Sequence, residues 1–128
     1  MGSCSPGGGG WSRVRYLVVP AHLNFTGSPH GGAIFSVADC AFGVASNSWG
    51  RVCVAIAVEL QFLATSELGE ELIAACRERS QTRQTTAHAV TVTGADERLV
   101  ASVQAMAWRT GRWHLGDDAR SPAWREAR

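Results

Sequence analysis

The segment 33–50, AIFSVADCAFGVASNSWG, constrains the fold of this chain more than any other stretch. Its apolar residues recur at spacings of three and four, which is the pattern of an α-helix with a buried face. These positions are Ala33, Ile34, Val37, Ala38, Ala41, Val44 and Ala45. Two further apolar side chains, Phe35 and Phe42, extend onto the remaining faces. The sequence therefore predicts a long helix that is buried nearly all round.

A single carboxylate, Asp39, lies in the middle of this predicted helix. Small or polar residues also recur every three or four positions and form one thin stripe with it: Ser36, Cys40, Gly43 and Ser46. No Lys or Arg stands three or four residues from Asp39. Burying an ionised carboxylate without a partner is costly. Asp39 is therefore either bonded to a backbone group or an arginine from elsewhere in the chain, or kept for a function.

Two glycines, Gly31 and Gly32, stand where the helix is predicted to begin. A helix N-terminus has unpaired N–H groups and the positive end of the helix dipole. Glycines leave these N–H groups accessible, so the turn suits a phosphate or a developing oxyanion. With Asp39 on the same helix, the segment combines an oxyanion site with a carboxylate base, which suits acyl transfer to water.

The residues around this turn resemble the motif of the hotdog-fold acyl-CoA thioesterases of the phenylacetate-degradation, PaaI-like type. The matching residues are Asn24-x-x-Gly27-x-x-His30-Gly31-Gly32, then Ala38-Asp39 and Ser46-Asn47-Ser48. Similar stretches follow at Gly69-Glu70-x-Leu72 and Leu99-Val100-Ala101, so the resemblance covers about residues 13 to 112. The chain departs from the family at its front, where a glycine-rich tail replaces a longer segment with a helix.

The resemblance implies hydrolysis of an acyl-CoA thioester, with an aromatic acyl group such as phenylacetyl or hydroxyphenylacetyl. CoA is then part of the substrate, and no other cofactor is expected. Asp39 would act as general base or as nucleophile, and the Gly31 N–H, assisted by Gly32, would donate to the oxyanion. Asn24 would orient water or substrate. His30 would either bond within the site or fix the turn.

The residues that contact the substrate are less narrowly defined. Phe42 is a candidate for the acyl pocket, although a core position explains it equally well. Five arginines come from strands or turns that can converge on the CoA phosphates, although a solvated edge explains them as well. They are Arg77, Arg79, Arg83, Arg109 and Arg112. We take Arg79 and Arg83 as the candidates for substrate binding.

Five strands are predicted around the helix. In the clearest of them, 52–63, the apolar residues alternate and are expected to share one face. They are Val52, Val54, Ile56, Val58, Leu60 and Phe62. The other predicted strands are 11–19, 72–79, 85–93 and 99–108, with an irregular tail from Thr110 onward. The pattern predicts an α+β fold with an antiparallel sheet wrapped around one helix, which is the hotdog fold of the resembling family.

Self-association is expected, because five strands leave much of a helix uncovered. Gly31 and Asp39 are eight residues apart, or about 12 Å along a helix axis. One helix therefore cannot easily bring both groups to a single carbonyl carbon. The sequence predicts a homodimer, or a pair of dimers, in which each active site is shared between two antiparallel helices.

The composition limits the remaining possibilities. At 128 residues the chain is expected to form one domain, 11–128, after a flexible glycine-rich tail, 1–10. The net charge is +1 and the twelve basic residues are dispersed, so no nucleic-acid partner is expected. No apolar run suits a membrane span, and the four cysteines and four histidines lack metal-ligand spacing. The absence of a signal peptide and of paired cysteine motifs favours the cytoplasm.

Two other functions remain open at this stage. The first is a non-catalytic hotdog protein that binds acyl-CoA, since a fold alone does not imply turnover. The second is a hotdog dehydratase, which requires a paired histidine and acid, and His30 is the only histidine near Asp39.

Overall fold

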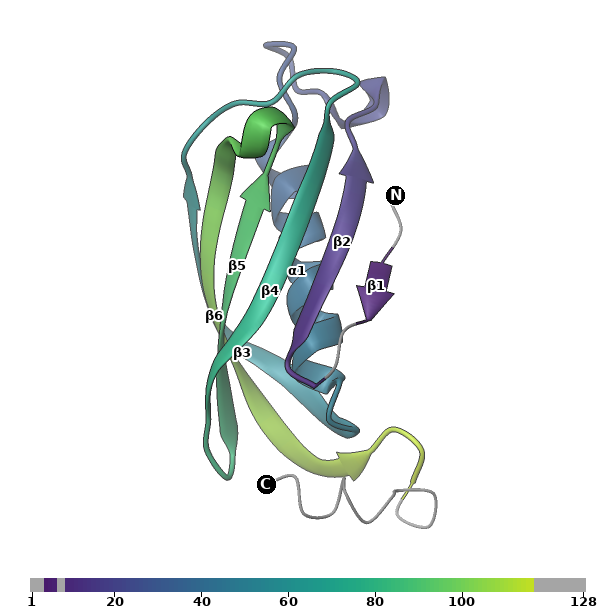
Figure 1. The fold of residues 1–128 in the computed structure, drawn as a ribbon, viewed down its shortest axis with the longest axis vertical. Coiled ribbons are helices and arrows are strands. Elements are labelled where there is room, and N and C mark those ends of the chain that lie inside the picture. The colour runs from purple at the N-terminus through teal and green to yellow at the C-terminus, as the bar shows by residue number, and fades with distance from the viewer. Residues whose placement is uncertain (1–3, 7–8, 117–128) are drawn as a thin grey trace.

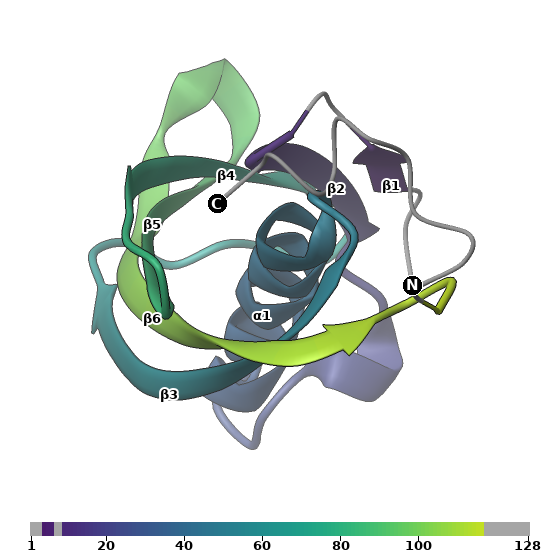
Figure 2. The same ribbon diagram turned by 90° about the horizontal axis from the view of Figure 1, so that it is seen from below.

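A computed structural model describes residues 4–6 and 9–116, which form one antiparallel sheet that curves around a single long helix (Figures 1 and 2). The helix is α1 (Gly31–Asn47), and two short 3-10 helices are η1 (Pro20–His22) and η2 (Ala95–Glu97). The strands are β1 (Cys4–Pro6), β2 (Trp11–Leu17), β3 (Arg51–Phe62), β4 (Glu71–Gln81), β5 (Thr85–Thr93) and β6 (Leu99–Trp113). Their order in the sheet is β1-β2-β4-β5-β6-β3.

This arrangement confirms the predicted α+β fold, its single long helix and all five predicted strands. It adds a sixth strand, β1, within the first ten residues, where the sequence predicted a flexible tail. The prediction of an irregular tail from Thr110 onward is wrong up to Trp113, because β6 continues and Trp113 pairs with Arg51 of β3. The Thr110 hydroxyl also donates to the Val52 carbonyl, at 2.6 Å, and holds this extension in place. The rest of the predicted tail, 117–128, lies outside the described residues.

The core lies between the concave face of the sheet and one face of α1. The buried helix residues are Ile34, Val37, Ala38, Ala41, Phe42, Ala45 and Ser46. Three of them are alanines, and such small side chains let the helix backbone approach the strands closely. Alternate residues of β2, β4, β5 and β6 complete the core from the sheet side. Among the described residues, no helix has the length and apolar character that a membrane span requires.

The opposite face of α1 is open, as expected from five strands around one helix, so the sheet of a single chain does not bury the helix nearly all round. Five residues on this face are exposed, and we call them the open stripe: Gly32, Phe35, Ser36, Asp39 and Cys40. The curved sheet of one chain wraps the helix over part of its circumference, as the view along the helix shows (Figure 2). Asp39 is therefore exposed to solvent within a single chain.

Strand β3 forms one edge of the sheet and contains a β-bulge. The register with β6 shifts between Ala55 and Ala57, so Ile56 is the extra residue. One inserted residue reverses the alternation of side chains, and the core-facing positions change from odd-numbered to even-numbered there. The prediction that all even-numbered apolar residues of β3 share one face is therefore wrong for Val52 and Val54, which lie before the bulge.

Candidate active site

The start of α1 is shaped by His30, which is the N-cap residue of the helix. Its Nδ1 accepts a hydrogen bond from the Gly32 N–H at 3.0 Å, and its carbonyl accepts from Ala33 at 2.9 Å. Its own N–H donates to the His22 carbonyl at 2.7 Å. A ring nitrogen that accepts from an amide carries no proton, so a neutral His30 holds its proton on Nε2. Of the two functions predicted for His30, the geometry therefore shows the one that fixes the turn.

The Gly31 N–H is the available donor at this helix end. Gly31 is the first residue of α1, and its N–H makes no hydrogen bond within the described part of the chain. The neighbouring Gly32 N–H is already bonded to His30. An unpaired N–H at the positive end of a helix dipole is a favourable donor to an anionic oxygen.

Asn24 closes the loop before the helix. Its side-chain Oδ1 accepts from the Thr26 N–H at 2.9 Å, from the Thr26 hydroxyl at 2.6 Å and from the Ser28 N–H at 3.2 Å. Such side-chain bonds to nearby amides are the usual way in which Asn stabilises a turn. Of the Asn24 side chain, only the Nδ2 group has no partner among the residues that the structure describes. Asn24 can therefore donate hydrogen bonds to a ligand, whereas its Oδ1 is already occupied as an acceptor.

Asp39 lies on the open stripe, two turns of helix beyond Gly31. It forms no ion pair with any other described residue. The separation along the axis is about 12 Å, so one chain does not bring the Asp39 carboxylate and the Gly31 N–H to a common point. Cys40, its neighbour, is exposed on the same stripe.

The three predicted substrate contacts lie elsewhere in the chain. Phe42 is only 3% exposed and packs edge-on against His88, with ring centroids 5.3 Å apart, so it belongs to the core rather than to an open pocket. Arg79 and Arg83 are exposed in the hairpin that joins β4 and β5. This hairpin lies at the opposite end of the molecule from the loop that leads into α1 (Figure 1). Within one chain, neither arginine lies beside Gly31.

His88 is a buried titratable group that the sequence did not single out. Its side chain is 0% exposed, and neither ring nitrogen finds a hydrogen-bond partner within the described residues. Burial disfavours the charged imidazolium and lowers the pKa of His88 to about 4. The neutral ring acts as a core side chain against Phe42.

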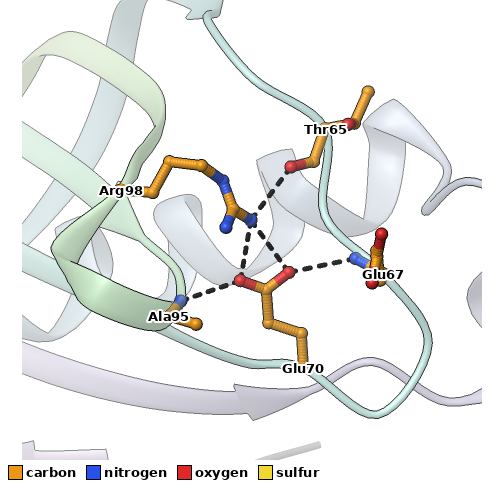
Figure 3. Close-up of polar contacts among 5 residues, drawn as sticks. All are labelled: Thr65, Glu67, Glu70, Ala95 and Arg98. Carbon is orange, nitrogen blue, oxygen red and sulfur yellow. Dashed lines mark hydrogen bonds and ion pairs between the residues drawn. The ribbon is translucent and has the colours of Figure 1, made fainter.

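Glu70 joins two connections of the chain, the β3–β4 loop and the β5–β6 loop, around a hollow of about 580 Å³ (Figure 3). Its carboxylate accepts from the Ala95 N–H at 2.8 Å and the Glu67 N–H at 3.0 Å, and it pairs with Arg98 at 2.7 Å. Arg98 also donates to the Thr65 carbonyl at 3.0 Å. Desolvation opposes the charge, but these donors hold the pKa of Glu70 below its usual value. Because both carboxylate oxygens of Glu70 are bonded, Glu70 holds the two loops together. No sequence pattern indicated that Arg98 would be its partner.

Comparison with known proteins places this geometry in a family. Residues 26–101 match the model of the Thioesterase superfamily. The acyl-coenzyme A thioesterase PaaI of Escherichia coli K12 is 34% identical over 108 residues, which is 84% of this chain and 77% of that protein. A relative from Archaeoglobus fulgidus is 34% identical over 100 residues, and the match covers 78% of this chain but only 65% of that relative.

Solved structures agree with the sequence comparison. E. coli PaaI, from the phenylacetic acid degradation operon, superposes with a TM-score of 0.79 at 34% identity, covering 80% of this chain and 75% of PaaI. The protein smu.793 of Streptococcus mutans UA159, solved bound to acetyl CoA, gives a TM-score of 0.83 at 30% identity, covering 87% and 90%. The chain belongs to the thioesterase superfamily, as a PaaI-like protein with the hotdog fold. The family and the fold predicted from the motif are thereby confirmed.

Proposed function

We propose that the chain hydrolyses acyl-CoA thioesters to a free acid and CoA, with a preference for aromatic acyl groups. The observation that carries this proposal is the free Gly31 N–H at the start of α1, on the helix whose open stripe contains Asp39. The similarity to E. coli PaaI supports the reaction class, and the acetyl CoA bound to the S. mutans neighbour supports the ligand class. The aromatic preference rests on the similarity to PaaI.

In the proposed reaction the thioester oxygen accepts a hydrogen bond from the Gly31 N–H. Negative charge develops on that oxygen as the carbonyl carbon becomes tetrahedral, so the bond strengthens in the transition state. A single donor of this kind accelerates a reaction by about 10²–10³-fold. His30 supports the donor indirectly, because its Nδ1 accepts from the Gly32 N–H and caps the turn in which Gly31 lies.

Asp39 activates the attack by one of two routes. As a general base it takes a proton from water, the hydroxide adds to the carbonyl carbon, and the C–S bond breaks as CoA leaves and takes up a proton. As a nucleophile its carboxylate attacks the carbonyl carbon directly, the C–S bond breaks as the CoA thiolate leaves and takes up a proton, and water then hydrolyses the resulting acyl anhydride. Both routes end in the same acid and the same thiol.

Each site is assembled from two chains in this proposal. The open stripe is apolar or small around Asp39, and the edge strand β3 has a free side, so both features can face a second copy of the chain. Two antiparallel α1 helices related by a two-fold axis place the Asp39 of one beside the Gly31 of the other. The partner chain would then cover Asp39, which restores the burial that the sequence predicted.

The same arrangement gives Arg79 and Arg83 a place near the substrate. Their hairpin lies at the end of the molecule away from the loop that leads into Gly31 (Figure 1). In an antiparallel pair, that end of one chain lies near the Gly31 end of the other. The two arginines of one chain would then meet the CoA phosphates of a substrate held at the Gly31 of its partner, and the Nδ2 donors of Asn24 remain free for water or substrate.

A panel of acyl-CoA thioesters, from acetyl-CoA to phenylacetyl-CoA and hydroxyphenylacetyl-CoA, tests the proposal through the release of free thiol. We expect turnover with phenylacetyl-CoA as the preferred substrate, and loss of that turnover in Asp39→Asn. Tight binding of acyl-CoA without thiol release from any member of the panel would replace hydrolysis by a binding function.

A further inference from the structure

The ring of Phe62 contacts the glycine that begins α1. A Cβ added to Gly31 would lie 3.0 Å from the Phe62 Cζ and 3.6 Å from each of Cε1 and Cε2. The ring therefore points end-on at the Gly31 Cα. Phe62 is the last residue of β3, and its side chain is 57% exposed, so most of the ring lies open beside the first turn of the helix.

This contact leaves little room for a side chain at position 31. Gly31 is absent from the described glycines with a positive φ, so its backbone conformation does not itself require glycine. A Cβ there would lie 3.0 Å from the Phe62 Cζ, which is tighter than ordinary van der Waals contact, so the ring would have to move by a few tenths of an ångström. The small residue and the ring that fills the space beside it thus fit one another.

The location of the ring is more informative than its exposure. Single exposed apolar side chains are common on protein surfaces and need no explanation. Phe62, however, stands directly beside the residue whose N–H is the free donor of the helix N-terminus. A thioester whose carbonyl oxygen accepts from that N–H places its acyl group within a few ångströms of the donor, and hence beside this ring.

We infer that Phe62 is a specificity-determining residue, whose ring packs against the acyl group of a substrate held at the Gly31 N–H. The inference rests on the proposed function and names the residue that selects its substrate. A phenyl group gains both buried area and an edge-to-face or offset contact with the Phe62 ring. An acetyl group gains neither, since its single methyl is too small to cover the ring.

Substitution of the ring tests this selectivity. Phe62→Ala should lower kcat/KM for phenylacetyl-CoA by about 10–100-fold, the value of burying about one aromatic side chain, and change acetyl-CoA turnover by less than about 3-fold. Leu63→Ala is the matched control, because Leu63 is the adjacent residue, is 51% exposed and does not meet Gly31. Equal effects of Phe62→Ala on both substrates, or a selectivity change in Leu63→Ala, would overturn the inference.

A double-mutant cycle tests the contact itself. Gly31→Ala keeps the N–H but adds the Cβ that collides with Phe62, so its loss of acetyl-CoA turnover should be at least about 5-fold smaller when Phe62→Ala is also present. Strictly additive effects would show that the ring does not press on this residue.

Binding separates this inference from the proposed function. The non-hydrolysable thioethers S-(2-oxo-3-phenylpropyl)-CoA and S-acetonyl-CoA keep a ketone oxygen for the Gly31 N–H, and calorimetry gives their Kd values. Phe62→Ala should weaken only the phenyl compound, by about 10-fold or more, and Leu63→Ala should weaken neither. If the wild type binds these ligands with that selectivity but releases no thiol from any thioester, hydrolysis is refuted and the assignment of Phe62 stands. If it hydrolyses thioesters while Phe62→Ala binds both thioethers as the wild type does, the assignment fails and hydrolysis stands.

Discussion

The two faces of α1 have similar side chains but different roles. The buried face, with Val37, Ala41 and Phe42, is apolar and makes the contacts that hold the helix against the sheet. The open stripe is also made largely of small or apolar residues, yet it holds Asp39 and an exposed Cys40. A substitution on the buried face should change stability, and one on the open stripe should change chemistry.

The comparison of the two faces shows that the apolar character of a helix face does not predict which element covers it. Nothing within the described part of the chain covers the open stripe, although its composition resembles that of a core. An apolar face that one chain leaves open is a surface suited to a second copy or to a ligand. In the proposed enzyme it serves both, because the partner helix and the thioester meet there.

The largest expected effect is on the open stripe. Asp39→Asn should keep the fold and lower turnover by about 10²–10⁴-fold, because the amide cannot act as a base or form an anhydride. Steady-state thiol release and circular dichroism are the measurements. A loss below about 3-fold would remove Asp39 from the chemistry.

On the buried face the comparison predicts a loss of stability instead. Phe42→Ala should lower the free energy of unfolding by about 3–5 kcal/mol, since it removes a buried ring and leaves a cavity beside His88. Phe42→Leu keeps more of the volume and should cost less. Urea unfolding measures both variants. If Phe42→Ala instead kept its stability and changed acyl selectivity, Phe42 would line the pocket after all.

Acid should lower the stability of the fold through His88, on the buried side of α1. Its pKa is about 4 in the folded chain against an ordinary value of 6.5, so between these values the unfolded chain binds the extra proton. The free energy of unfolding should therefore fall as the pH drops from about 6.5 to 4, by up to about 3 kcal/mol, and should not change through His88 above that range.

Unfolding by urea at several pH values measures this dependence. His88→Leu should flatten it across the same window, and a slope that persists in that variant would assign the titration to another group.

The smallest effect is expected at the helix start, between the two faces. His30→Ala removes the N-cap and should cost about 0.5–2 kcal/mol of stability. Asn is a good N-cap residue, so His30→Asn should recover most of that loss together with the activity. Recovery of stability without activity would show that the imidazole itself takes part in the reaction.

The parts of the fold that the sequence predicted are those set by local patterns. The spacing of Ile34, Val37, Ala41 and Ala45 defines α1, and alternation defines the strands. The bulge at Ile56 was missed because apolar residues continue to alternate through it. An uncovered helix face was expected from the number of strands, but the sequence did not show which residues lie on it, because small and apolar side chains look alike whether or not another element covers them.

The candidate site also has one part that local sequence patterns predict and another that they do not. The motif located Gly31 and Asp39 because their spacing is local, but the contact between Gly31 and Phe62 joins two elements that are far apart in the sequence. The partnership of Glu70 with Arg98 is of the same kind. Such pairs depend on how strands and loops pack, which no local pattern encodes.

The sharing of each site between two chains is the central claim, and mixed dimers test it directly. Asp39→Asn removes the base, and Gly31→Pro removes the oxyanion donor at a helix position where proline is tolerated. Each variant must be folded and inactive by itself, and heterodimers are isolated through two different affinity tags. Shared sites predict that a heterodimer recovers about half of the wild-type activity, because one of its two sites receives an intact Asp39 and an intact Gly31. Folded heterodimers that stay as inactive as their parents would contradict the account.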